Sequence, residues 1–320
     1  MVSGRALHFV VRVPDRKKTI QFYRDILGMK VLRHEEFREG CAAACNGGYD
    51  NRWSKTMVGY GPEDTHFVVE LTYNYMVRDY KLGNDLVALT IRSSEALKRA
   101  REATWPVLEE NGKYFLQAPI GYKMEIIDEP QPTDKERSLC AFLFSDPVEK
   151  ISLAVSNLER SIKYWHGLLK MKIVNKSEKS VQLSYGDGQA LLELCDIGAP
   201  VVRETAGGRI AFAVPFEQQP EIDSIIQKAN EKILTPLISL DTPGKATVRV
   251  IILADPDGHE ICFVDEEGFR PLSAVDPESN DLIEKCIRLD KSDKFFGKDQ
   301  LEVNLTPRMV KILNWVIFHC

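Results

Sequence analysis

Three polar side chains, each with apolar residues on either side, lie within strand-like segments: His8 in LHFVVRV, Glu70 in FVVELT and Glu125 in YKMEII. These segments have the composition of strands, in which alternate residues share a face. A glutamate is seldom buried unless it is paired or bound to a metal, so three such side chains facing one cavity would explain each other. Imidazole and carboxylate groups suit Zn²⁺, Ni²⁺, Co²⁺ or Fe²⁺, and the pattern therefore predicts a metal centre.

Interpretations without a metal stay open for each of these residues. His8 could be a hydrogen-bonded histidine of the core. Glu70 could lie on a solvated sheet face or pair with Arg12, and Glu125 could pair with Lys123. Arg12 itself could belong to a simple structural ion pair.

The chain contains the same unit twice. The segment LHFVVRVPDRKKTIQFYRDILGMKVL, which begins at Leu7, reappears from Glu149 as EKISLAVSNLERSIKYWHGLLKMKIV without a gap. The repeat is too widely spaced for a solenoid, so it indicates a duplicated domain. Where the first copy has His8, the second has Lys150, so the chemistry of the two copies need not be the same.

Each copy is predicted to hold two units of the pattern βαβββ. In the first unit, Asp15 can cap the helix, and Gly28 occupies the position of a left-handed C-cap. We expect strands at 7–13, 31–37, 55–59 and 67–72 in unit one, and at 86–91, 114–116 and 122–127 around a helix at 93–103 in unit two. Unit three is expected over 151–194, and unit four over 209–264 with a helix near 221–231. The Pro- and Asp-rich residues 131–147 indicate a linker.

Four such units, grouped two and two, resemble the vicinal-oxygen-chelate superfamily, whose paired units curl their sheets around a concave cavity. The likeness covers residues 5–267 and depends on FYRDILGM, on ELTYNY at 70–75 and on GYKMEI at 121–126. The first half is most similar to glyoxalase I, and the stretch CNGGY at 45–49 resembles the glyoxalase domain-containing protein 4 family. The resemblance implies an α+β fold with tandem glyoxalase-like domains at 5–130 and 148–267, followed by a tail at 268–320.

The resemblance assigns His8, Glu70 and Glu125 to three of the four metal-ligand positions of glyoxalase I. The metal would be Zn²⁺, Ni²⁺ or Co²⁺. The fourth position, normally histidine, falls at about Val87, which cannot bind a metal. This departure puts the metal affinity in doubt, and the activity with it.

The implied reaction converts the hemithioacetal of methylglyoxal and glutathione into S-lactoylglutathione, which detoxifies methylglyoxal. Glu125 would be the base that removes the proton from carbon, while the metal would stabilise the enediolate. Arg12 and Asn74 match family positions that contact the co-substrate glutathione. The alternative is a catalytically weak or inactive binding protein that keeps a small-molecule pocket. An extradiol dioxygenase is disfavoured, because its iron site needs two histidines and a carboxylate.

In the second copy, the matching positions hold Lys150, Glu193, Arg209 and Cys262. Two cations replace ligands, so we expect a buried ion network or an anion site there rather than a metal. We interpret His259 as structural and Cys262 as a core thiol.

The pairing of the units decides which residues meet. If units one and two pair, His8, Glu70 and Glu125 converge, and we favour this arrangement because it keeps the surviving ligands together. If unit one pairs with unit four, His8 and Glu70 meet Arg209 and Cys262, and Glu125 meets Glu193 and Lys150.

Composition and charge exclude some classes of partner. The chain has 320 residues, of which 44% are hydrophobic and 28% charged, with a net charge of −5. These values are typical of a soluble globular protein and argue against nucleic-acid or membrane partners. The apolar run at 309–318 is too short to span a bilayer, and we expect a short helix that packs on the body.

The seven cysteines are odd in number and scattered, which indicates reduced thiols of an intracellular protein. Folded structure is expected to begin by Ala6, which leaves no room for a leader. We therefore expect a cytoplasmic protein that binds a small-molecule substrate, with mitochondria as the address that the family resemblance adds. Because both domains are fused in one chain, a monomer would suffice.

Overall fold

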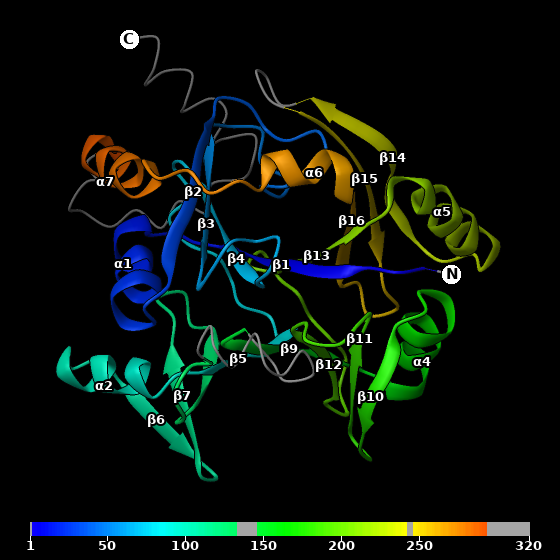
Figure 1. Cartoon of the computed structure of the whole chain (residues 1–320), viewed down its shortest axis with the longest axis horizontal. Helices are drawn as coiled ribbons and strands as arrows, with labels where there is room; N and C mark the ends of the chain where they lie inside the picture. The colour runs from blue at the N-terminus through cyan, green and yellow to red at the C-terminus, as the bar shows by residue number, and fades with distance from the viewer. Residues whose placement is uncertain (1, 133–145, 242–245, 293–320) are drawn as a thin grey trace.

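The computed structural model of the chain describes residues 2–132, 146–241 and 246–292. Two eight-stranded sheets lie one above the other, with helices packed around them (Figure 1). Sheet A has the strand order β14-β15-β16-β13-β1-β4-β3-β2, and sheet B the order β10-β11-β12-β9-β5-β8-β7-β6. The α+β fold built from βαβββ units is confirmed.

The bounds of the elements follow the four units. Unit one has β1 (Arg5–Arg12), α1 (Arg16–Ile20), β2 (Lys30–Phe37), β3 (Trp53–Gly59) and β4 (Val68–Asn74). Unit two has β5 (Leu86–Arg92), α2 (Ser94–Glu102), β6 (Val107–Glu110), β7 (Lys113–Gln117) and β8 (Lys123–Ile127). Unit three has β9 (Val148–Val155), α4 (Leu158–Ile162), β10 (Lys172–Lys176), β11 (Ser180–Ser184) and β12 (Leu191–Asp196). Unit four has β13 (Arg209–Val214), α5 (Gln219–Lys228), β14 (Ile233–Asp241), β15 (Thr247–Ala254) and β16 (Glu260–Asp265).

The units do not pair in sequence order, and the arrangement that we favoured is wrong. Strand β1 pairs antiparallel with β13, which joins units one and four in sheet A. Strand β5 pairs antiparallel with β9, which joins units two and three in sheet B. Each unit leaves the outer edge of its first strand unpaired, and the first strand of any other unit can satisfy that edge. The wish to keep His8, Glu70 and Glu125 together was therefore no physical ground for pairing unit one with unit two.

Local signals at the first helix were read correctly. The Asp15 side chain accepts a hydrogen bond from the backbone N–H of Lys18, as an N-cap does. The helix continues as a π-helical turn over Gln21–Ile26, and Gly28 follows with a φ of 78°. A Cβ on Gly28 would lie 2.5 Å from Nη2 of Arg99, whose flexible side chain could shift, so the positive backbone angle is what favours glycine here.

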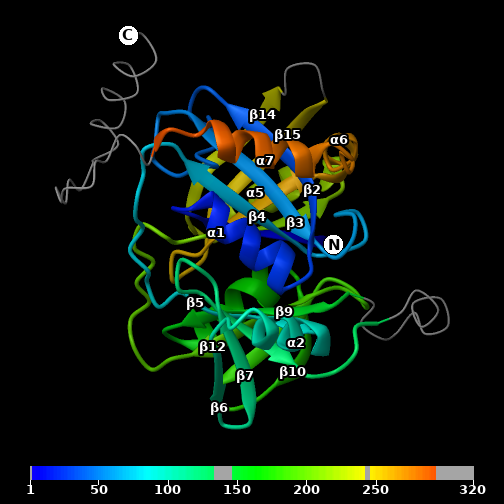
Figure 2. The ribbon, with the colours of Figure 1, turned by 90° about the vertical axis from the view of Figure 1, so that its left-hand side faces the viewer.

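The central strands bury both faces, which explains their apolar composition. On one face, residues such as Phe9, Ile91, Leu153 and Phe212 belong to a core that both sheets and their helices share. The opposite faces of the two sheets line separate cavities. In Figure 2, sheet A forms the upper part of the molecule and sheet B the lower part.

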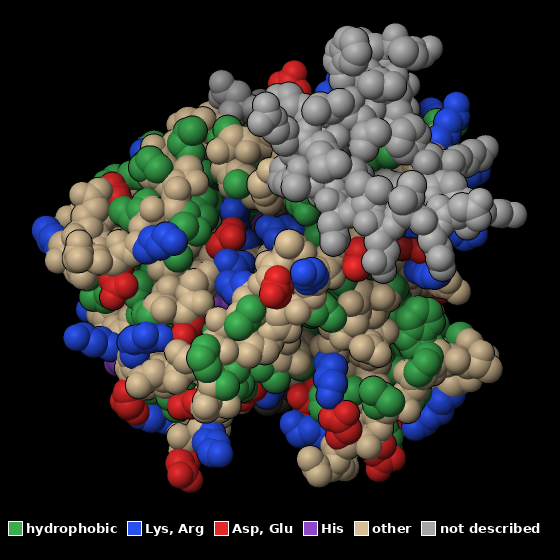
Figure 3. All heavy atoms as spheres, turned by 180° about the vertical axis from the view of Figure 1, so that it is seen from behind, with side chains coloured by type: hydrophobic (Ala, Val, Ile, Leu, Met, Phe, Trp, Pro, Cys, Tyr) green, Lys and Arg blue, Asp and Glu red, His purple; other side chains and the backbone are tan. Residues whose placement is uncertain are grey.

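The face of the molecule seen in Figure 3 carries mixed charge. On the face that Figure 3 shows, basic and acidic side chains are interspersed, without an extended patch of one sign. None of the helices in residues 2–132, 146–241 and 246–292 combines the length and hydropathy that a membrane crossing needs.

Two helices beyond the repeat, α6 (Glu266–Leu272) and α7 (Ser279–Leu289), belong to the segment predicted as a tail. Helix α7 packs against β2. In the segment just before the helix, the backbone N–H of Asp276 donates to the carbonyl of Leu32 in β2 at 2.9 Å. The predicted C-terminal helix at 309–318 lies outside the described residues.

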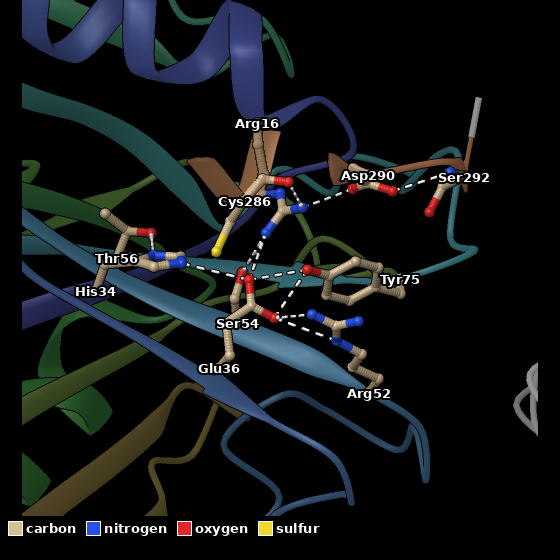
Figure 4. Close-up of polar contacts among 10 residues, drawn as sticks. All are labelled: Arg16, His34, Glu36, Arg52, Ser54, Thr56, Tyr75, Cys286, Asp290 and Ser292. Atoms are coloured by element: carbon tan, nitrogen blue, oxygen red, sulfur yellow. Dashed lines mark hydrogen bonds and ion pairs between the residues drawn. The ribbon is translucent and has the colours of Figure 1, made fainter. Parts of the chain in front are cut away.

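A cluster of polar side chains, which we call the tail clamp, fixes the end of α7 to unit one (Figure 4). It consists of Arg16, Glu36, Arg52, Tyr75 and Asp290. Arg16 donates to Glu36 at 2.8 Å and to Asp290 at 2.6 Å. Arg52 and the Tyr75 hydroxyl also donate to the Glu36 carboxylate, at 2.9 and 2.8 Å. Burial alone would raise the pKa of Glu36, but His34, the two arginines and Tyr75 outweigh it and lower the pKa to about 2.

We predict that the two sequence halves remain associated after a cut between residues 132 and 146. The β1–β13 and β5–β9 pairs both join strands from opposite sides of that cut. Co-expressed halves should elute together as a 1:1 complex in size-exclusion chromatography. Two separate folded monomers would contradict the pairing.

The tail clamp predicts a loss of stability in acid. Because the pKa of Glu36 is lower in the folded state, its contribution is complete above about pH 4.5 and is lost as the pH falls towards 2. Glu36→Gln should lower the free energy of unfolding at neutral pH by about 2 kcal/mol and flatten its decline below pH 4.5. Urea titrations at several pH values measure both effects. The exposed Glu159→Gln serves as control. If the stability of Glu36→Gln fell below pH 4.5 as steeply as that of the wild-type protein, Glu36 would not be the group that causes the acid sensitivity.

Candidate functional site: two cavities on separate sheets

The first cavity, cavity A, lies on sheet A and has a volume of about 480 Å³. Its walls are mostly apolar and include Trp53, Val250 and Phe269. Among the polar residues that line it are His8, Glu70, Arg209 and Cys262, which strands β1, β4, β13 and β16 contribute. This is the set that the alternative pairing of units predicted.

A buried carboxylate orients His8. Nδ1 of His8 lies 2.6 Å from Oε1 of Glu63, and Arg33 donates to the other oxygen of Glu63 at 3.1 Å. Burial alone would raise the pKa of Glu63, but His8 and Arg33 hold it below its usual range. The ionised carboxylate can only accept, so Nδ1 of His8 carries the proton of this hydrogen bond. The other ring nitrogen, Nε2, lies 3.6 Å from Oε2 of Glu70.

The two remaining key positions of cavity A hold Arg209 and Cys262. Arg209 donates to Glu260 at 2.8 Å and to the backbone carbonyls of Ala43 and Ala44. Burial raises the pKa of Cys262 to about 12, so the thiol is neutral at physiological pH. Its expected place as a buried core thiol is confirmed.

One pair of cysteines departs from the expectation of reduced thiols. Cys41 and Cys45 are joined by a disulfide, and both line cavity A. The loop between them supplies the carbonyls that accept from Arg209. Spacing alone did not reveal the bond, because a single CxxxC pair has no sequence signature of its own. Cys195, Cys262 and Cys286 are free thiols.

The second cavity, cavity B, lies on sheet B and has a volume of about 600 Å³. Leu82, Val87 and Phe115 are among its apolar lining residues. Glu125 on β8 accepts from Lys113 at 2.7 Å and from the Thr90 hydroxyl at 3.3 Å. The side chain of Glu125 is 13% exposed and that of Lys113 is 55% exposed, so the lysine approaches from the solvent side of the cavity.

A second Glu–Lys pair lines cavity B. Lys150 donates to Oε2 of Glu193 at 2.7 Å, and the Ser152 hydroxyl donates to the same oxygen at 2.6 Å. Gln182 donates to the other oxygen at 2.9 Å. Burial would raise the pKa of Glu193, but these hydrogen bonds outweigh it and lower the pKa. The ion network predicted for Lys150 and Glu193 is therefore present, while Arg209 belongs to cavity A.

Glu125 does not converge with His8 and Glu70, because it lies on sheet B and they lie on sheet A. That part of the sequence prediction is wrong, and its cause is the pairing of units. Glu125 also pairs with Lys113 rather than with Lys123, whose ammonium contacts Glu110. Glu70 contacts His8 and the Thr72 hydroxyl, and no ion pair to Arg12 forms among the described residues.

Neither residue predicted to contact glutathione lines cavity A or cavity B. Asn74 is fully buried, and its amide is committed to Asn46 and to the Tyr80 hydroxyl. Arg12 donates to the carbonyl of Thr205 at 2.9 Å. His259 is structural, with Nε2 at 2.7 Å from the carbonyl of Ala154.

Sequence reasoning missed Glu63 and Lys113. Glu63 lies in the loop before β4, outside every periodic segment, and Lys113 lies at the start of the short strand β7. Neither position carries a signal in a single sequence, because only the folded sheets bring these side chains to His8 and Glu125.

The divalent metal that the fold family implies fits neither cavity well. His8 and Glu70 provide two ligand atoms in cavity A, but Arg209, which cannot bind a metal, occupies a third position, and Cys262 does not form a compact group of ligand atoms with them. In cavity B, each glutamate already has an ammonium group at 2.7 Å. Within the described ranges, the single group of three candidate ligands with atoms within 4.8 Å is His34, Glu36 and Cys286. Two guanidinium groups of the tail clamp already occupy Glu36 there, so a cation would be repelled.

Comparisons with known proteins agree with this architecture. Residues 5–147 match the Glyoxalase/Bleomycin resistance protein/Dioxygenase superfamily, and residues 157–272 match the C-terminal domain of glyoxalase domain-containing protein 4-like proteins. The solved structure of glyoxalase I from Zea mays superposes with a TM-score of 0.68 at 25% identity, covering 91% of this chain and 97% of that chain.

Two curated relatives extend over nearly the whole chain. "Glyoxalase 1" of Caenorhabditis elegans is 42% identical, over 92% of this chain and 100% of its own length. Glyoxalase domain-containing protein 4 of Rattus norvegicus is 52% identical, over 93% of this chain and 97% of its own length. The chain therefore belongs to the glyoxalase domain-containing protein 4 family, within the glyoxalase/bleomycin resistance/dioxygenase superfamily.

Proposed function

We propose that the protein isomerises the hemithioacetal of methylglyoxal and glutathione, or a closely related thiol adduct, to the corresponding thioester in cavity B. The observation that carries this proposal is the presence of Glu125 and Glu193 in one cavity, on strands β8 and β12. Proton transfer between neighbouring carbons needs a positioned general base, and a carboxylate that lines cavity B can serve as one. The names of the relatives, glyoxalase I in maize and "Glyoxalase 1" in the nematode, support this reaction class.

Glu125 is our candidate for the base. Its carboxylate would take the proton from the carbon that bears sulfur, and would return it to the neighbouring carbon after the double bond shifts. The Thr90 hydroxyl holds one carboxylate oxygen, which limits the orientations of the group. Lys113 can move aside when substrate enters, because more than half of its side chain is exposed. Glutathione would enter as the co-substrate.

The second candidate is a binding protein without turnover. One observation favours it: both glutamates of cavity B are paired with lysines, and burial is outweighed at Glu193 by hydrogen bonds from Lys150, Ser152 and Gln182, which lower the pKa of that carboxylate and make it a weaker base. A protein of this kind would bind the adduct in cavity B and release it unchanged.

Glu125→Gln tests the base directly. The substitution keeps the shape of the side chain and its contact with Thr90 but removes the basic oxygen, so kcat should fall by roughly 10²–10⁴-fold. The rise in absorbance at 240 nm with methylglyoxal plus glutathione measures turnover. Glu159→Gln, in an exposed pair with Lys176, is the matched control.

Full activity in Glu125→Gln would remove Glu125 from the role of base. No turnover in the folded wild-type protein, together with binding of S-lactoylglutathione in calorimetry, would favour the binding protein instead.

A further inference from the structure

We propose that the ammonium groups of Lys150 and Lys113 take the place of the divalent cation in cavity B, so that the site works without a metal. This inference rests on the proposed function and names the groups that stabilise its charged intermediate. The poor fit of a metal to cavity B is its starting point.

The first support is the position of Lys150 in the repeat. Lys150 occupies the place in β9 that His8 occupies in β1, since the two copies align without a gap. A fixed positive charge therefore stands where the other copy has an imidazole.

The second support is the balance of charge. Two glutamates and one divalent cation sum to zero formal charge, and so do Glu125, Glu193, Lys113 and Lys150. Lys150 and Glu193 are 17% and 12% exposed, so at this depth a charge without its partner would be costly. Adding a dication would leave two excess positive charges in the cavity, whereas the lysines already meet the requirement.

The third support is the register of the central strands. Thr90 on β5 lies beside Glu125 on β8 in one direction and beside Lys150 on β9 in the other. Neighbouring strands are about 4.8 Å apart, so Glu125 and Lys150 start from backbones roughly 10 Å apart on the same row. A carbonyl and its neighbouring carbon can lie between the carboxylate and the ammonium group.

Lys150 is held more firmly than Lys113. Its partner Glu193 is itself anchored by Ser152 and Gln182, so the ammonium group is preorganised. Such fixed charge stabilises a developing oxyanion without the cost of reorganising solvent. We assign Lys150 the role of holding the enediolate oxygen, with Lys113 closing on the substrate from the exposed side.

The step balances without another reactant. Glu125 removes the proton from the carbon that bears the hydroxyl and sulfur, and the electron pair of that C–H bond forms the carbon–carbon double bond. The neighbouring carbonyl oxygen takes the negative charge, beside the Lys150 ammonium group. Glu125 then returns its proton to the former carbonyl carbon, and the thioester carbonyl forms as the hydroxyl proton is lost to the enediolate oxygen. The sum is an isomerisation.

The experiment compares turnover of the full-length protein at 240 nm before and after exhaustive treatment with a chelator, with its metal content measured in parallel. Lys150→Met removes the charge and keeps much of the aliphatic chain, so kcat should fall by roughly 10²–10³-fold with a smaller change in KM. Lys150→Arg should lose less, because the positive charge remains. Lys176→Met is the control, since Lys176 also pairs with a glutamate at 2.7 Å but lies outside cavity B.

The inference holds if chelated protein with far less than one metal ion per chain keeps its turnover, and if Lys150→Met loses it while retaining the wild-type melting temperature. Turnover that the chelator abolishes and Zn²⁺, Ni²⁺ or Co²⁺ restores would overturn it and leave the proposed function intact. The inference would also be overturned if turnover resisted the chelator but Lys150→Met turned over as fast as the wild-type protein. Absence of turnover with and without metal would overturn the proposed function itself.

Discussion

The antiparallel pairing of first strands, β1 with β13 and β5 with β9, determines the rest of the structure. Within each four-stranded unit, one edge of the first strand has no partner. Joining two such edges completes a sheet of eight strands. Because unit one joins unit four and unit two joins unit three, every cavity combines residues from both halves of the chain. The sequence repeat and the structural sheet are therefore different divisions of the same molecule.

This pairing separated the predicted ligands and gave each cavity its own chemistry. Cavity A keeps an imidazole beside a carboxylate, with His8 oriented by Glu63, but has an arginine and a neutral thiol at the other positions. Cavity B keeps two carboxylates, each paired with a lysine, and Lys150 occupies the position that His8 has in the first copy. Balanced charge, rather than a shared set of ligands, is what the two sites have in common.

Local features could be predicted from the sequence, because they depend on residues close in the chain. Asp15 as a helix cap, Gly28 in a left-handed conformation and the faces of His8 and Glu70 are examples. The partner of β1 could not be predicted, since edge strands of all four units are chemically alike. The exposed strand β6 was missed because it lacks apolar alternation, and the contact of Glu63 with His8 was missed because a loop supplies it.

Units two and three, which pair with each other, lie between units one and four in the chain. This arrangement sets the order in which the two sheets can form during synthesis. Units two and three are contiguous in the chain, so sheet B can close once β12 at Leu191–Asp196 has left the ribosome. Strand β1, the first to emerge, has to wait for β13 at Arg209–Val214. During that interval its open edge and the apolar wall of cavity A are available to other chains, and non-local pairing of this kind is slow and prone to aggregation. The first unit is therefore the part of this protein whose first strand stays longest without its partner during synthesis.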